Sequence, residues 1–304
     1  MTGLLDAARL LDRRRLRALS LAVRHDVDAG VVRSHGTDPS LVARLEGPFE
    51  SVEDAHERIR ALEIALRGGN DRRAVFATIY SRMTGAVREA IESGRFTDAE
   101  WMREYTVTFA EYYRRAFLAF ERGRPGRVPD PWVVAFGTAV EGSALVAQDA
   151  FLGVNAHINY DLALALRDVG IDPTRPEKRV DHDRIDDILA GLIDAQQRAL
   201  TDLYAPGIAD VDASLGRFDE RLSLFPMTEG RAQAWRLAVV LTDFDGTPIT
   251  RYARWVLRTT ATGAAQFVRS PPVAPSVLQA LERVERDVPL GEALTVLADR
   301  LDAR

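Results

Sequence analysis

The stretch that decides the fold is PWVVAFGTAVEGSALVAQDAFLGVNAHINYDLALALRDVG, residues 131–170. It is rich in alanine and leucine and holds no proline after its first position. Pro131 suits the first turn of a helix and Gly170 suits the end of one, so the stretch predicts helix. At about 1.5 Å per residue, one straight helix of this length would overshoot a compact domain. We therefore expect a break near Gly142 or Gly153.

The rest of the chain repeats the helical pattern between glycine and proline breakers. Ser51, with Asp54 three residues later, predicts one helix start, and Thr97 with Glu100 forms a capping box for another. Strand signals are nearly absent, which predicts an all-α fold, a single bundle of about eight or more helices. The predicted helices are residues 3–24, 51–68, 71–94, 97–123, 131–170, 181–204, 228–242 and 250–268, with one or two short helices in the tail.

Breakers and changes of pattern suggest three regions. Residues 1–46 form an N-terminal helical extension and connector, and residues 47–272 form a helical core domain that carries the polar part of residues 131–170. Residues 273–304 form a C-terminal helical tail.

The composition excludes several classes of protein. With 46% hydrophobic and 28% charged residues, the 304-residue chain has the balance of a soluble globular protein. Its net charge of -5 argues against a nucleic-acid-binding face. The absence of cysteine excludes disulfides and thiolate sites. No apolar run approaches the roughly 20 residues of a membrane span, and the arginine-rich N-terminus lacks the features of a secretion signal. We expect a cytoplasmic protein.

Four polar residues alternate inside the most apolar helix: Asn155, His157, Asn159 and Asp161. In a helix, the two asparagines lie one turn apart on one stripe, and His157 and Asp161 lie one turn apart on another. A buried polar group without a partner costs several kcal/mol, on the order of 2–7. Four such residues therefore imply either a shared polar network or a solvent-filled cavity.

The His-x-x-x-Asp spacing supports two functions. Both side chains can bind one divalent metal, since imidazole and carboxylate are common ligands. Alternatively, Asp161 orients His157 and makes it a general base near neutral pH. A third interpretation is structural: a hydrogen-bonded pair that joins two helices inside the core.

Other residues are candidates for the same site. Asp183 begins the helix that follows after a short loop, and an antiparallel return would bring it to His157 and Asp161 as a further metal ligand. The neighbouring Asp181 and His182 fit a solvated helix start better.

Tyr80 and Glu111 lie on two other predicted core helices, and we predict that they contact a cofactor or ligand in the same cavity. The ordinary alternative for Glu111 is an ion pair with Arg115 four residues on. The tryptophans at 132, 235 and 255 are predicted core anchors.

The segment VVLTDFDGTPI, residues 239–249, is similar to the nucleophile motif of haloacid dehalogenase-type phosphatases. Asp243 would be the nucleophile and Asp245 the general acid. No lysine and no alternation of strands and helices follow it, so a turn between two helices is the preferred interpretation.

The chain resembles the family catalogued as domain of unknown function 5995 over roughly residues 50–270. The run Asn-Ala-His-Ile-Asn-x-Asp-Leu, residues 155–162, is its most specific element. The resemblance implies that this run is a hallmark of the family, and it implies no activity. Looser matches are Phe76, Tyr80, Thr84, Phe96, Asp98, Trp101, Met102, Phe109, Ala110, Tyr113, Val128, Pro129, Trp132, Gly153, Asp183, Ala234 and Trp235.

His157 and Asp161 also match one His-x-x-x-Asp helix of the all-α zinc-dependent phospholipases C. Those enzymes need more histidines than the five of this chain for their trinuclear site, so at most one metal is expected.

These observations predict a small-molecule-converting all-α enzyme with a buried polar pocket. The pocket residues are His157, Asp161, Asn155 and Asn159, and His157 is a general base or the main ligand of one divalent metal. The alternative is a non-catalytic helical module that binds a ligand or partner, with the polar run as a structural network. We expect a small-molecule substrate or ligand, no nucleic acid and no membrane span, and we leave a homodimer open.

Overall fold

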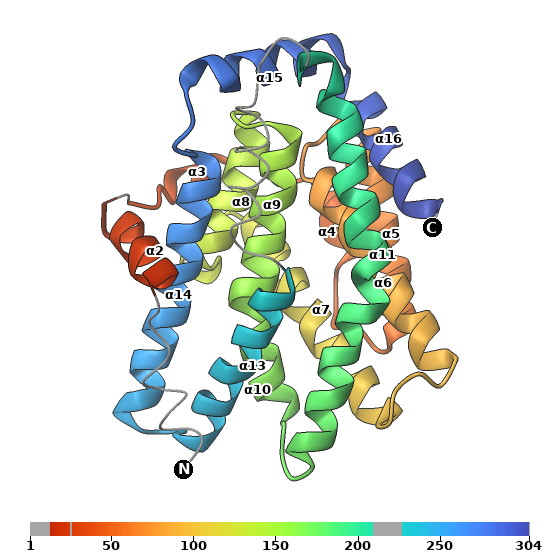
Figure 1. Ribbon diagram of the computed structural model, residues 1–304, viewed down its shortest axis with the longest axis vertical. Coiled ribbons are helices and arrows are strands. Elements are labelled where there is room, and N and C mark those ends of the chain that lie inside the picture. The colour runs from red at the N-terminus through yellow and green to blue at the C-terminus, as the bar shows by residue number, and fades with distance from the viewer. Residues whose placement is uncertain (1–12, 25, 209–226, 304) are drawn as a thin grey trace.

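The computed structural model describes residues 13–24, 26–208 and 227–303, and every regular element in these ranges is a helix. The all-α prediction is therefore confirmed (Figure 1). The first half of the chain forms α2 (Arg13–Arg24), α3 (Gly30–Ser34), α4 (Pro39–Arg44), α5 (Val52–Gly68), α6 (Ala74–Glu92), α7 (Ala99–Glu121), the short η1 (Pro125–Arg127) and α8 (Asp130–Glu141). The second half forms α9 (Val146–Ala156), a π-helical turn η2 (His157–Asp161), α10 (Leu162–Val169), α11 (Arg175–Ile208), α13 (Met227–Asp243), α14 (Pro248–Arg269), α15 (Pro275–Asp287) and α16 (Leu290–Asp302).

The helix breaks follow the local signals with one shift. The hydroxyl of Ser51 accepts from the backbone N–H of Asp54 and begins α5, as predicted. Thr97 does not cap α7. The cap is Asp98, whose carboxylate accepts from the N–H of Trp101. The N–H of Thr97 instead donates to Asp181.

The predicted break in residues 131–170 lies at Gly142. Its φ of 62° places it in the left-handed region that ends α8. Gly153 does not interrupt the chain, which continues through α9, η2 and α10 as one rod. Gly153 serves close packing instead, because a Cβ there would lie 2.3–2.6 Å from side-chain atoms of Phe76 on α6.

The rod of α9, η2 and α10 forms the centre of the bundle. α9 packs against α6, α8 and α14, while η2 packs against α7, α13 and α14. α10 packs against α7 and α13. Because other helices surround the rod, its residues are mostly apolar, and its few polar side chains are largely removed from water.

The N-terminal part of the chain joins the same core. α2 lies against α14, and a Cβ on Gly263 would come within 1.8 Å of the carbonyl oxygen of Ala18. The predicted connector holds two short helices, α3 and α4, whose Val32 and Leu41 are buried. Residues 3–12 of the predicted first helix lie outside the described residues. The division into three regions stays a prediction.

The late motif with Asp243 and Asp245 lies at the end of α13 and in the turn before α14, which agrees with the preferred interpretation as a turn between two helices. The two carboxylates pair with Arg175 and Arg167. Trp132 and Trp235 are buried as predicted, but Trp255 is not a core anchor: it is 51% exposed, because it lies on the outer side of α14.

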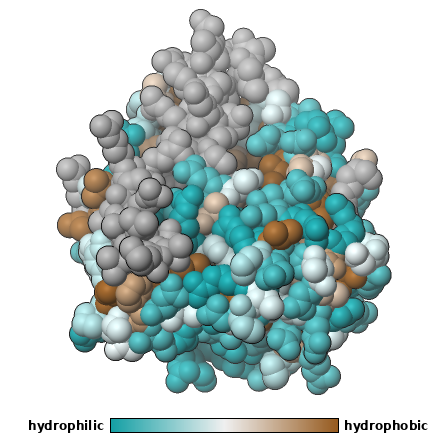
Figure 2. Space-filling model, turned by 60° about the horizontal axis from the view of Figure 1, so that its bottom comes forward, coloured by the Kyte–Doolittle hydropathy of each residue, from teal (hydrophilic) through white to brown (hydrophobic). Residues whose placement is uncertain are grey.

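The described part of the face in Figure 2 is mostly hydrophilic, with apolar residues in small groups. Among the described helices, none is both long and apolar enough to span a membrane.

Candidate functional site

His157 and Asp161 form the hydrogen-bonded pair that their spacing predicted. The Nδ1 atom of His157 lies 3.0 Å from Oδ2 of Asp161, and both side chains are buried. The indole Nε1 of Trp132 on α8 donates to the same Oδ2 over 2.8 Å. Since an indole can only donate, this oxygen is an acceptor, and the consistent partner is a protonated Nδ1. The lone pair of the imidazole then lies on Nε2.

Two atoms of the pair have no partner among the described residues: Nε2 of His157 and Oδ1 of Asp161. Most buried polar atoms in folded proteins have a hydrogen bond, so each exception needs a reason. The phenolic oxygen of Tyr113, whose ring lies 6.1 Å from that of His157, is a third such atom.

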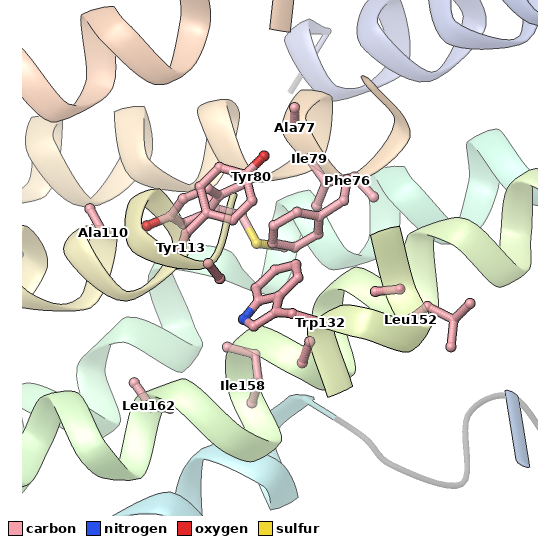
Figure 3. Packing of buried hydrophobic residues seen from close by; sticks show 14 of the residues in the cluster. Phe76, Ala77, Ile79, Tyr80, Ala110, Tyr113, Trp132, Leu152, Ile158 and Leu162 are labelled. Atoms are coloured by element: carbon pink, nitrogen blue, oxygen red, sulfur yellow. The ribbon is translucent and has the colours of Figure 1, made fainter. Parts of the chain in front are cut away.

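Aromatic rings surround the imidazole. Phe109 on α7 stacks on it with a centroid separation of 3.7 Å, and the ring of Tyr80 on α6 lies 4.5 Å away, edge to face. Figure 3 shows the Phe76, Tyr80, Tyr113 and Trp132 side chains gathered in one group, with Ile158 beside Trp132. These rings pack around the imidazole and restrict its orientation.

This surrounding changes the proton affinity of both members. Burial lowers the pKa of His157 well below its ordinary value. Burial raises the pKa of Asp161 well above its ordinary value, although the Trp132 hydrogen bond acts in the opposite sense. The favoured state has no net charge: a neutral imidazole beside a protonated carboxyl, whose proton lies on the unpartnered Oδ1. The two groups titrate as a pair.

The widened turn η2 carries His157 and Asp161 and packs against α13. A Cβ on Gly230 of α13 would be 2.7 Å from the side-chain oxygen of Asn159 and 2.9 Å from Ile158. The bare backbone of Gly230 therefore lets α13 approach η2 closely. π-Helical turns of this kind occur often at functional sites.

His157 lines a cavity of about 60 Å³ between α6, α7, α9, α11 and α13. Most of its wall is apolar, but Tyr80, Tyr105 and Arg231 also line it. Polar sites of this size have room for ordered water or for one end of a small molecule.

Arg231 is the charged group of this cavity, and it is buried. Its Nε donates to Asp186 over 2.7 Å, and its Nη2 donates to the carbonyl oxygen of His182. Nε2 of His182 lies 3.2 Å from the carbonyl oxygen of Arg231, and Nδ1 lies 2.9 Å from the hydroxyl of Tyr105. A carbonyl can only accept, so His182 carries its proton on Nε2. Burial raises the pKa of Tyr105 to about 12.

The prediction of a solvated start for Asp181 and His182 was wrong, since both are fully buried. Asp181 accepts the backbone N–H groups of Thr97 and Asp98 and so joins α11 to the start of α7. The physical reason is the direction of packing. This end of α11 turns the stripe of Asp181 and His182 toward the bundle and leaves Asp183 outside.

Asp183 is consequently exposed and pairs with Arg179 over 2.7 Å. It is not brought to the His157–Asp161 pair. In the described ranges no three histidine or acidic side chains are grouped so that they could hold a metal ion. The predicted three-ligand set is not assembled.

The two asparagines turn away from His157. The amide of Asn155 donates to the carbonyl oxygen of Ala261 on α14, and Asn159 donates to Asn155. Asn159 lines a second cavity of about 50 Å³ against α2, α13 and α14. Neither asparagine lines the His157 cavity.

Tyr80 lies at the cavity as predicted, whereas Glu111 does not line it. Glu111 is buried and binds Arg114 through two hydrogen bonds, with Arg115 at 3.3 Å. It also accepts the N–H of Phe49.

Sequence reasoning missed Arg231, Tyr105 and His182 as site residues. Arg231 is one of many arginines, and its burial depends on which side of α13 faces η2. His182 carried a usable signal, since a histidine within an acidic run that also supplies an apolar stripe is a candidate for burial.

Comparison with known proteins supports the resemblance found in the sequence. The model of a family of unknown function, DUF5995, matches residues 52–271. The chain belongs to this family. The DUF5995 match includes α5 to α14, and with them every residue that lines the His157 cavity. No curated protein and no solved structure matches the chain.

Proposed function

We propose that this member of the DUF5995 family converts a small molecule in the cavity beside His157, with His157 as its general base. The observation that carries the proposal is the buried Nε2 of His157, which has no hydrogen-bond partner in the described part of the chain, while Nδ1 is fixed on Asp161. A core histidine that served packing alone would be expected to satisfy both nitrogens, as His182 does.

The proposed chemistry uses two polar groups that line the cavity, the imidazole of His157 and the guanidinium of Arg231. A ligand acid, O–H, N–H or an activated C–H, transfers its proton to Nε2, and the electron pair of the broken bond stays on the ligand. The imidazolium keeps its Nδ1–H bond to Asp161, and the guanidinium of Arg231 on the same cavity wall stabilises the developing negative charge. Returning the proton from Nε2 to another ligand atom completes the reaction.

A metal-dependent version has less support. Oδ2 of Asp161 already accepts from Nδ1 and from Trp132, so the carboxylate acts on the imidazole instead of converging with it on an ion. Catalytic zinc sites generally use about three protein ligands.

The alternative function is a non-catalytic module in which the polar run joins helices. The hydrogen bond from Asn155 to Ala261 of α14, together with the one from Asn159 to Asn155, favours this alternative for the two asparagines of the run. They do not account for Nε2 of His157.

The tautomers of the two buried histidines test the base directly. In ¹⁵N-edited NMR spectra of the full chain at neutral pH, we expect His157 as the Nδ1–H tautomer and His182 as the Nε2–H tautomer. His182→Gln and His157→Gln assign the signals. If His157 carries its proton on Nε2, the atom offered to a ligand is a donor and the proposal is wrong.

Chemical modification tests whether the base can be reached. Diethyl pyrocarbonate acylates unprotonated imidazole nitrogen, and mass spectrometry locates the product. We expect His157 to react at least about tenfold faster than His182, because both nitrogens of His182 are bonded and its modification requires local unfolding. Thr106→Trp, which fills the cavity wall, should slow His157, and Thr201→Trp on the exposed side of α11 should not. Equal rates for the two histidines would favour the structural network.

A further inference from the structure

A third concave site lies at the other end of α7, away from the His157 cavity. It is a hollow of about 400 Å³ beside the last turns of α7 and η1. Leu118 and Ala119 contribute its apolar part, and none of the described residues that line it is acidic. The remaining lining consists of arginines: Arg114, Arg115, Arg122, Arg124 and Arg127.

The positive charge of this hollow is only partly neutralised. Glu111 binds Arg114 through both of its carboxylate oxygens and lies 3.3 Å from Arg115. Glu46 pairs with Arg122. Five guanidinium groups thus meet two carboxylates, which leaves an excess of three positive charges in a chain whose net charge is -5.

The two arginines contributed by η1 and the residue before it are the uncompensated ones. Within the described ranges, Arg124 and Arg127 have no carboxylate at ion-pair distance, and both side chains are exposed. Arg114 is instead fixed, since it also donates to the carbonyl oxygen of Leu45 over 3.0 Å. The hollow therefore combines guanidinium groups that are held by hydrogen bonds, such as that of Arg114, with those of Arg124 and Arg127, which no described carboxylate pairs.

From this arrangement we infer that the hollow binds a small anion that carries two or more phosphoryl groups. Guanidinium groups present parallel N–H donors that match phosphate oxygens in pairs. Several of them around one hollow fit a compact polyanion better than a single carboxylate. The volume falls in the range of small-molecule sites, about 300–1,000 Å³. The site is independent of the proposed base, because Tyr105 and Phe109 of the His157 cavity lie in the other half of α7.

Calorimetric titration of the full chain with inorganic tripolyphosphate at low salt tests the site. We expect saturable binding of one anion per chain that weakens as sodium chloride is added. Arg124→Gln combined with Arg127→Gln should weaken binding by about tenfold or more, since it removes the two free guanidinium groups. Arg251→Gln combined with Arg254→Gln is the matched control, because it removes two exposed charges from α14 outside the hollow. Circular dichroism confirms that both variants are folded.

Three results would overturn the inference. The first is no saturable binding of tripolyphosphate to the folded wild type. The second is an equal loss of affinity in the control pair, which would show attraction to net charge alone. The third is displacement of tripolyphosphate by single-stranded RNA that binds more tightly, which would make the hollow part of a nucleic-acid surface.

Discussion

Gly153→Ala is expected to lower the free energy of unfolding by about 3 kcal/mol, the upper range for overpacking a core. The added methyl group would lie 2.3–2.6 Å from Cβ, Cγ and Cδ2 of Phe76. These atoms are at the root of the side chain, so the whole residue must move. Phe76 in turn contacts Tyr80, Tyr113, Trp132 and His157, so the disturbance reaches the site.

Gly191→Ala is the matched control for urea unfolding. Gly191 also lies inside a helix, but no atom of the described residues lies within 4 Å of a Cβ there. Alanine should stabilise that position by roughly 0.5–1 kcal/mol, because it reduces the flexibility of the unfolded chain. In a Phe76→Ala background, which removes Cγ and Cδ2, the effect of Gly153→Ala should become smaller. If both Gly→Ala variants lowered the free energy of unfolding by similar amounts, the contact with Phe76 would not be the cause of the effect at Gly153.

His182→Gln is expected to remove a large part of the acid sensitivity of the fold. Burial, together with the charges of Arg231 and Arg179, lowers the pKa of His182 well below its ordinary value. Glutamine can replace both hydrogen bonds of His182 but cannot take up a proton. The comparison of wild type and variant therefore isolates one titrating group.

The direction follows from proton binding. Below the ordinary histidine pKa of about 6.5, the unfolded chain binds a proton at position 182 and the folded chain does not. This contribution to stability is present above about pH 6.5 and is lost as the pH falls, by about 1.4 kcal/mol per pH unit. Between pH 7 and pH 4.5 the wild type should therefore lose more stability than His182→Gln. Denaturant unfolding at several pH values measures the difference, and parallel curves would contradict it.

Asp161→Asn should remove a loss of stability that occurs as the pH rises, whereas His182→Gln removes one that occurs as the pH falls. Asparagine offers one oxygen to Trp132 and His157 and mimics the protonated carboxyl. Because burial raises the pKa of Asp161, the folded wild type keeps a proton that the unfolded chain releases above about pH 4. The stability that the variant gains over the wild type should therefore grow as the pH rises above about 4. A constant difference would show that Asp161 is ionised in the folded protein.

The helices could be predicted from the sequence because the signals that determine them are local. The Ser51 cap, the Gly142 break and the apolar spacing in residues 131–170 each depend on neighbours in the chain. His157 and Asp161 were predicted as a pair for the same reason, since four residues on one helix determine their contact.

Contacts between helices were harder to foresee. Asp183 and His182 are adjacent, and a rotation of α11 by one residue decides which of them enters the core. Asn155 and Asn159 were assigned to the site because they are polar and near His157, yet the stripe they occupy faces α14. Arg231 enters through the docking of α13 at Gly230, which no local pattern encodes.

The widened turn of residues 157–161 fixes the phase between the two halves of the central rod. It accommodates one residue more than an ordinary α-helical turn, and each residue of an α-helix advances the rotation by about 100°. Deleting one residue from this turn would rotate α10, from Leu162 onward, by about 100° about the helix axis relative to α9. The leucines of α10 that face α7 and α13 would then point in other directions. The extra residue of η2 therefore sets the rotation of α10 on which its packing against α7 and α13 depends.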